Sequence, residues 1–203
     1  MAMEPVPSHV GSPSQEASRG DYEEFVKFYD PSWVNWSNDE TGQTTLLGAM
    51  ANKSPADRAA IANRLLDDGA DPTLGDIEGF TPLHSLLGAR NHDLALDIPL
   101  LKRLVAGGAD LNGLANRVGT PLRALLTNRN LLFPDSKPLL ETFLSYPGID
   151  VLAVAANGNS HLETARRMNI PWRTELLEDY LRREGLDVPP PVEIADPRSS
   201  PSA

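Results

Sequence analysis

The sequence predicts an all-α fold made of repeated helix-turn-helix units with short β-turn or hairpin connections. Three observations support this prediction. A Thr or Ser that precedes a leucine-containing segment recurs at positions 44, 81, 120 and 160, with spacings of 37, 39 and 40 residues. The tripeptide Gly-Ala-Asp recurs downstream, at 69–71 and 108–110. The leucines of these segments have the three- and four-residue spacing of one helical face.

The two ends of the chain differ from its centre in composition. Residues 1–17 and 186–203 contain eight of the 18 prolines and few large apolar residues. Such segments cannot bury enough surface to offset their ordering entropy, so both are expected to be disordered. Residues 18–38 predict an N-terminal capping helix, because Ser18 and Asp21 have capping-box spacing ahead of an aromatic helical face.

The repeat domain is expected to span residues 39–185, and prolines indicate where its helices begin. A Thr or Ser caps free backbone N–H groups, and a proline in the first helical turn loses no hydrogen bond. Pro82 and Pro121 therefore begin first helices that end near Ala89 and Thr127. The second helices are expected to begin at the remaining internal prolines that follow each first helix. These are Pro55, Pro99, Pro138 and Pro171.

Glycines are expected to end the second helices in the left-handed conformation. Gly69, Gly107 and Gly148 stand at these positions. After each of them comes a short extended stretch and a turn, of which Asn157-Gly158 is the strongest turn dipeptide. The predicted unit is therefore turn, helix, loop, helix, turn.

These residues resemble the ankyrin repeat, whose Thr-Pro-Leu-His signature is present in full at 81–84. The resemblance covers about 39–183 and implies a solenoid of about four repeats, in which the ring of His84 bonds between neighbouring turns. The copies are longer than the family's ~33 residues, and the surplus falls at 52–54, 90–97 and 128–136. The first and fourth copies match less well, as terminal capping repeats do. The residues that carry the resemblance are Thr81, Pro82, Leu83, His84, Gly69, Gly108, Thr120 and Pro121.

Composition and charge exclude several classes of protein. The chain has no cysteine, which excludes disulfides and thiolate metal sites. Its longest apolar run, 151–156, is far shorter than the ~20 residues of a membrane helix. A net charge of −10 disfavours nucleic acid as a partner. We therefore expect a soluble, cytoplasmic protein that is monomeric when unbound and has neither a nucleic-acid nor a membrane partner.

No catalytic, metal or cofactor site is predicted. His92 lies near Asp93 and Asp97, but one His-Asp pair is a weak metal signal, and a solvated loop is the favoured interpretation. His161 is expected on the surface. The chain has no phosphate-binding loop, dinucleotide fingerprint or nucleophile elbow. The sequence thus predicts a protein that is not an enzyme.

Acidic residues concentrate in the first part of the chain. Residues 21–78 carry 12 acidic and four basic side chains, whereas residues 79–183 carry ten acidic and 12 basic ones. Two interpretations remain open: a solvated cap that prevents end-to-end stacking, or a docking surface for a basic partner.

The resemblance implies a protein-protein interaction module that binds through its concave surface. The alternative is an immunity-protein or antitoxin type of inhibitor that occludes the active site of a basic toxin or enzyme. Phe80 is the favoured hot spot, its alternative role being packing against the adjacent turn. The candidate contact residues are Glu40, Thr41, Gln43, Ile77, Glu78, Phe80, Arg117, Asn157 and Asn159.

Overall fold

The computed structural model describes residues 11–192, and the chain divides into two compact units, Met1–Asp150 and Val151–Ala203. Residues 11–192 contain ten α-helices and no strand, which confirms the all-α prediction. Three isolated β-bridges, one of them Ser37–Thr44, close turns that precede helices. The remainder of both predicted disordered ends, 1–10 and 193–203, lies outside the described residues.

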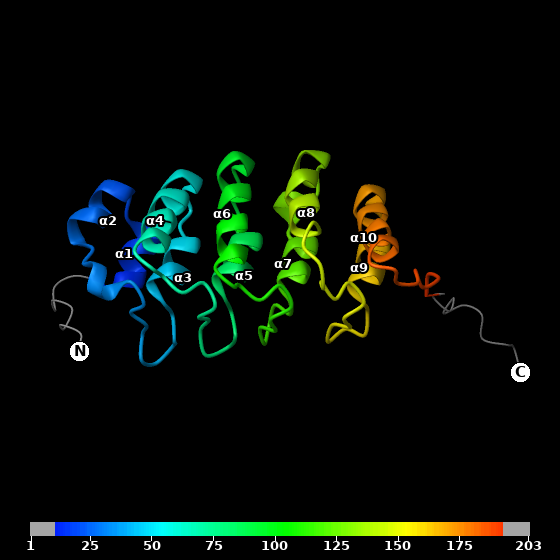
Figure 1. Cartoon of the computed structure of the whole chain (residues 1–203), viewed down its shortest axis with the longest axis horizontal. Helices are drawn as coiled ribbons and strands as arrows, with labels where there is room; N and C mark the ends of the chain where they lie inside the picture. The colour runs from blue at the N-terminus through cyan, green and yellow to red at the C-terminus, as the bar shows by residue number, and fades with distance from the viewer. Residues whose placement is uncertain (1–10, 193–203) are drawn as a thin grey trace, which may run out of the picture. The chain divides into compact units, whose positions relative to one another are not determined.

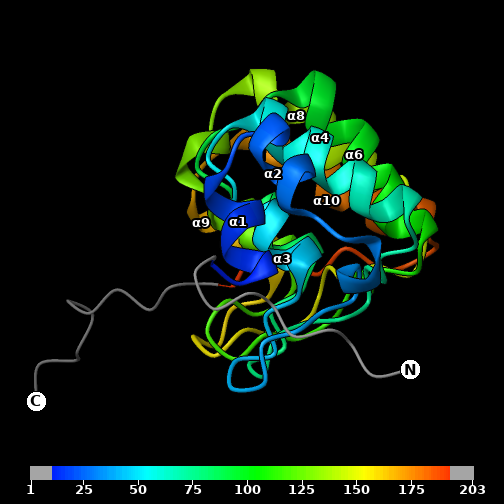
Figure 2. The ribbon, with the colours of Figure 1, turned by 90° about the vertical axis from the view of Figure 1, so that its left-hand side faces the viewer.

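The first unit is built from helix pairs arranged in two rows. The helices α3, α5 and α7 pack side by side in one row, and α4, α6 and α8 form the other (Figure 1). The turns that precede α3, α5 and α7 all project on the same side of these rows (Figure 2). Its helices are α1 (Pro13–Arg19), α2 (Tyr22–Phe28), α3 (Thr45–Met50), α4 (Pro55–Asp67), α5 (Pro82–Leu87), α6 (Leu94–Ala106), α7 (Pro121–Thr127) and α8 (Lys137–Phe143).

The helix starts predicted in this unit are confirmed at three of the prolines, and the start predicted at Pro138 is late by one residue, because α8 begins at Lys137. Pro55, Pro82 and Pro121 each occupy the first helical position. The start predicted at Pro99 is wrong, because α6 begins at Leu94 and contains Pro99 in its interior. The Asp93 carboxylate caps this earlier start by accepting a hydrogen bond from the Ala95 N–H at 3.0 Å.

Left-handed glycines end two of the second helices, at Gly69 and Gly108, whereas the stop predicted at Gly148 is wrong, because α8 ends at Phe143, five residues earlier. Gly69, Gly108 and Gly148 have φ of 94°, 97° and 76°. The prediction of Gly107 as the stop is wrong by one residue, because Gly107 has φ of −81° and still belongs to the last turn of α6. The Gly-Ala-Asp motif thus begins at the residue whose backbone conformation favours glycine.

The expectation of disorder over residues 1–17 is wrong for its described part, because Pro13–Arg19 form α1. Ser12 caps this helix, and Gln15 completes the capping box. Gly48 of α3 has no side chain, so the backbone of Ser14 packs directly against it. The single predicted N-terminal helix is in fact two, because the chain leaves the helical conformation at Gly20 before Asp21 caps α2.

Leucines make up most of the core of the first unit, as their helical spacing predicts. Leu65, Leu83, Leu87 and Leu104 are fully buried. Burying one such side chain contributes about 1.5–3 kcal/mol, so these rows hold the helix pairs together.

Asparagine amides connect each helix pair of the first unit to the structure before it. The Asn52 side chain donates to the Ala17 and Gly20 carbonyls, at 3.1 and 2.9 Å. Asn128 does the same with the Leu87 and Ala89 carbonyls, at 3.0 and 2.8 Å.

Asn91 repeats this contact in the intermediate pair by donating to the Lys53 carbonyl at 3.0 Å. All three asparagines lie in the stretches that lengthen the repeats. The extra residues therefore carry side chains that satisfy backbone carbonyls between neighbouring pairs.

The second unit contains α9 (His161–Arg167) and α10 (Pro171–Arg183), and Pro171 confirms its predicted helix start. The prediction of a surface His161 is wrong, because that side chain is 2% exposed. The described part of the tail is also ordered against this unit, contrary to expectation. The Arg166 guanidinium donates to the Pro189 carbonyl at 2.9 Å, which holds the tail beside α9.

Candidate interaction surface

Backbone hydrogen bonds connect the turns that precede α3, α5 and α7. The Ile77 N–H donates to the Thr41 carbonyl at 3.0 Å, and the Asn116 N–H donates to the Glu78 carbonyl at 2.9 Å. The Asp76 carboxylate shapes the middle turn from within, by accepting the Glu78 and Phe80 N–H groups, both at 2.9 Å. Three consecutive turns are therefore joined without using their exposed side chains.

Gly79 makes this close approach possible. Its φ is 80°, and a Cβ at this position would lie 2.6 Å from the Leu114 carbonyl oxygen. Gly42 occupies the equivalent place in the turn before, where a Cβ would lie 3.0 Å from the Ile77 nitrogen. These turns can therefore pack against each other only because both positions lack a side chain.

Two large apolar side chains project from these turns into solvent. Ile77 is 72% exposed and Leu114 is 75% exposed. Large apolar side chains that are exposed on neighbouring turns and have a polar rim are candidates for a binding site. We call the patch formed by these side chains and their polar neighbours the turn-tip surface. It comprises Glu40, Thr41, Ile77, Glu78, Leu114 and Arg117.

The polar rim of the turn-tip surface is mostly acidic. Glu40 is exposed beside Asp39, and Glu78 faces the Arg117 guanidinium at 3.5 Å. Both partners of this ion pair are well exposed, so it is screened and adds little to stability. A binding partner can therefore replace the Glu78–Arg117 pair with its own charges at small cost.

Phe80 lies half-buried at the start of α5, with hollows on either side. One hollow, of about 410 Å³, extends toward Met50 of α3. The other, of about 270 Å³, extends toward Ala124 of α7. The ring also packs at 5.5 Å from the ring of His84, so Phe80 has one face on the scaffold and the other toward open space.

His84 joins the start of α5 to the next turn. Its Nδ1 accepts a hydrogen bond from the Thr81 N–H at 3.2 Å, and its Nε2 donates to the Gly119 carbonyl at 2.9 Å. Burial lowers the pKa of His84 below its ordinary value of 6.5, so the ring is held in its neutral form. This side chain supports the turns and does not face a ligand.

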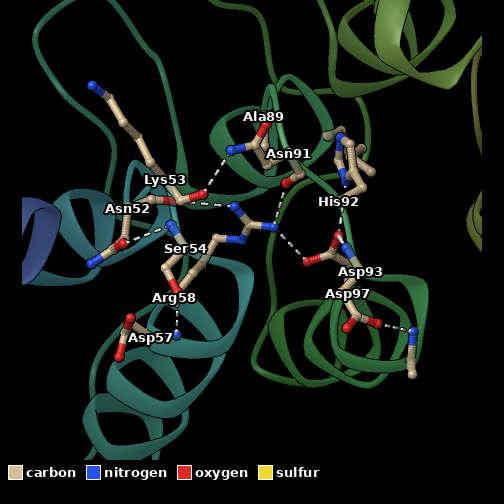
Figure 3. A network of polar contacts seen from close by, with 12 residues as sticks. Asn52, Lys53, Ser54, Asp57, Arg58, Ala89, Asn91, His92, Asp93 and Asp97 are labelled. Atoms are coloured by element: carbon tan, nitrogen blue, oxygen red, sulfur yellow. Dashed lines mark hydrogen bonds and ion pairs between the residues drawn. The ribbon is translucent and has the colours of Figure 1, made fainter. Parts of the chain in front are cut away.

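A buried ion pair joins α4 to α6 beside the loops that follow α3 and α5 (Figure 3). The Arg58 guanidinium donates to the Asp97 carboxylate at 2.9 Å, and the two side chains are 1% and 0% exposed. Arg58 also donates to the Asn52 and Asn91 carbonyls, at 3.1 and 2.8 Å. It thereby holds two loops that belong to consecutive helix pairs.

The expectation of a solvated His92 is wrong. Its side chain is 7% exposed, and its Nδ1 donates to Asp97 at 2.8 Å, while its Nε2 lies 3.3 Å from the Asn128 amide. Arg58 already neutralises the Asp97 carboxylate, so the cluster satisfies itself. Within residues 11–192, no group of three or more His, Asp or Glu side chains could hold a metal ion.

Seven of the nine predicted contact residues belong to the first unit and the other two to the second unit. Those of the first unit lie on or beside the turn-tip surface, and they are Glu40, Thr41, Gln43, Ile77, Glu78, Phe80 and Arg117. Gln43 is only partly exposed. Asn157 and Asn159 belong to a turn of the second unit, where the Asn157 side chain accepts a hydrogen bond from the Asn159 N–H at 3.2 Å.

Sequence reasoning missed Leu114, the most exposed of the large apolar residues within positions 11–192. It stands five residues before Gly119, whereas Ile77 stands two residues before Gly79, so matching the glycines did not locate it. The sequence signal that could have located Leu114 is its position directly after Asn112 and Gly113, residues that are typical of turns.

No protein-family model and no curated protein matches the chain. Among solved structures, 233 chains match, so the fold is widely shared. One of them is a functionally unknown protein from Leptotrichia buccalis C-1013-b, with 23% identity, a TM-score of 0.68, and coverage of 87% of this chain and 96% of that one. At this level of identity, the likeness shows the fold alone, and a fold does not by itself define a function.

None of the helices in residues 11–192 is long and apolar enough to cross a membrane.

Proposed function

We propose that this chain is a non-enzymatic interaction module of the ankyrin-repeat type, which binds a protein partner through the turn-tip surface and the adjoining face of α5. The observation that carries the proposal is the exposure of Ile77 and Leu114 on turns locked together by backbone hydrogen bonds. A rigid scaffold with exposed apolar anchors loses little conformational entropy on binding. The Thr81–His84 signature and the paired helices support the repeat type.

The test is capture of the partner with two matched variants. Ile77→Ser/Leu114→Ser removes both apolar anchors without touching the backbone bonds, and is expected to weaken partner binding by about tenfold or more. Phe133→Ser removes an equally exposed apolar side chain, 70% exposed, from the loop between α7 and α8. This control should bind like the wild type. Equal retention of the partner by all three proteins would contradict the proposal.

Phe80→Ala provides an independent check of the α5 face. Because the Phe80 ring is only half-buried between two hollows, its loss is expected to change Tm little and to weaken partner binding. A large fall in Tm with unchanged binding would instead assign Phe80 to packing.

The second candidate function is that of an inhibitor that covers the active site of a basic toxin or enzyme. The acidic rim formed by Asp39, Glu40 and Glu78 favours it, since opposite charge raises the rate of association. This version predicts a basic enzyme among the captured proteins and an association rate that falls as salt is raised to ~0.5 M, where exposed charges are screened. A partner that associates at the same rate in both salts would exclude charge steering.

A further inference from the structure

The hollow between α3 and α5 differs in charge from the rest of the molecule. Its volume is about 410 Å³, within the range of ligand-binding pockets. Three charged side chains line it, and all are cations: Lys53, Arg58 and Arg90. The chain as a whole has 28 acidic residues against 18 basic ones, so this is a positive site in an acidic protein.

The three cations are not equally neutralised. The Asp97 carboxylate pairs with the Arg58 guanidinium at 2.9 Å. Lys53 and Arg90 are exposed and form no ion pair within residues 11–192. The Arg58 side chain is buried and paired with Asp97, so the cations accessible to a ligand are Lys53 and Arg90.

The other wall of the hollow is apolar. The half-buried Phe80 and the almost fully buried Met50 line the space, and Gly88 leaves it unfilled on the α5 side. A ligand with one anionic group beside an apolar group would satisfy both walls. The Lys53 ammonium and the Arg90 guanidinium can both pair with a carboxylate, and the apolar wall accommodates an uncharged side chain next to it; phosphate, which also pairs with such cations, is the competing ligand that the experiment must exclude.

We propose that this hollow, the α3–α5 pocket, receives an aspartate or glutamate side chain of the partner protein, with an adjacent apolar residue of the partner against Phe80. The proposal rests on the proposed function and adds a second point of contact with different chemistry. The partner then presents a basic area to the acidic rim and a carboxylate to the α3–α5 pocket. Such a mixed pattern selects against proteins that are merely basic.

The experiment is an NMR titration of the full chain, observed at the amides of Ser85, Gly88 and Asn91. The probes are the peptide acetyl-Leu-Asp-Leu-amide, its matched acetyl-Leu-Asn-Leu-amide, and inorganic phosphate, each up to ~10 mM. We expect the Asp peptide to move these amides in a saturable way, and the Asn peptide to bind at least about fivefold more weakly. Equal binding of the two peptides, no shift with either, or phosphate binding as tightly as the Asp peptide would overturn the proposal.

The variant Lys53→Gln/Arg90→Gln is expected to weaken Asp-peptide binding by about fivefold or more, whereas Lys102→Gln, an exposed charge of α6, should leave it unchanged. The captured partner then separates this proposal from the proposed function. If the partner no longer binds Ile77→Ser/Leu114→Ser but binds Lys53→Gln/Arg90→Gln as tightly as the wild type, only the assignment of the α3–α5 pocket is overturned.

Discussion

Replacing Asp97 with asparagine is expected to destabilise the chain strongly. Asparagine has nearly the same shape, so no cavity forms, but the Arg58 guanidinium loses its counter-charge at 2.9 Å and the His92 Nδ1 loses its carboxylate at 2.8 Å. Both members of the Arg58–Asp97 pair are at most 1% exposed. Removing one partner of such a buried pair costs about 3–5 kcal/mol. For 203 residues, this corresponds to a fall in Tm of about 6–20 °C.

The assay is urea unfolding followed by far-ultraviolet circular dichroism, with an exposed ion pair as the control. Asp67 lies closer to its cation, 2.6 Å from Arg103, but the two side chains are 66% and 37% exposed. Asp67→Asn is therefore expected to cost at most about 1 kcal/mol. The double variant Arg58→Met/Asp97→Asn should lose less than the sum of its single variants, because no buried charge is left unpaired. An Asp97→Asn loss as small as that of Asp67→Asn would refute the reasoning.

Two further predictions concern the turns. Because the pKa of His84 is lowered in the folded chain, the unfolded chain binds a proton at this histidine more readily. The stabilising contribution of neutral His84 is therefore full above pH 6.5 and is lost as the pH falls toward the folded pKa. Urea midpoints should fall across that pH window, and His84→Asn should reduce the dependence of the midpoint on pH. Gly79→Ala and Gly69→Ala should each cost about 1–2 kcal/mol for a left-handed alanine. Gly79→Ala should cost more, because its methyl would lie 2.6 Å from the Leu114 carbonyl while nothing lies within 4 Å at Gly69; equal losses in chemical denaturation would contradict close packing of these turns.

Local signals in the sequence predict most of the helices, because they act within a few residues. The Thr-Pro pairs at 81–82 and 120–121 set helix starts through capping and through the fixed φ of proline. The same logic failed at Pro99, where an aspartate six residues earlier caps the helix and the proline lies in its interior. A proline shows where a helix is permitted to begin, and the capping side chain decides where it does begin.

Contacts between residues that lie far apart in the chain could not be predicted from the sequence. His92, Arg58 and Asp97 each have an ordinary surface environment when only their chain neighbours are considered. They are buried because consecutive helix pairs bring positions 39 residues apart, Arg58 and Asp97, within hydrogen-bonding distance. The α3–α5 pocket was missed for the same reason, since its cations come from separate loops.

The candidate site was predictable in part. The positions next to the turn glycines located Ile77 and Glu78, because a left-handed glycine shows where a turn lies. Side-chain exposure also depends on the neighbouring turn. Neither the high exposure of Leu114 nor the partial burial of Gln43 therefore follows from the local sequence.

The contacts between helix pairs have a direction that matters while the chain is being synthesised. Asn52, Asn91 and Asn128 each donate to carbonyls that precede them in the chain, so their acceptors have already left the ribosome when they emerge. Arg58 is the opposite case, because its carboxylate is not made until Asp97. The nascent chain can therefore add helix pairs in order, but the first pair has no counter-charge for its buried cation until the first turn of α6 has been made. The first pair alone therefore holds a buried cation without a counter-charge, and the second pair supplies that charge.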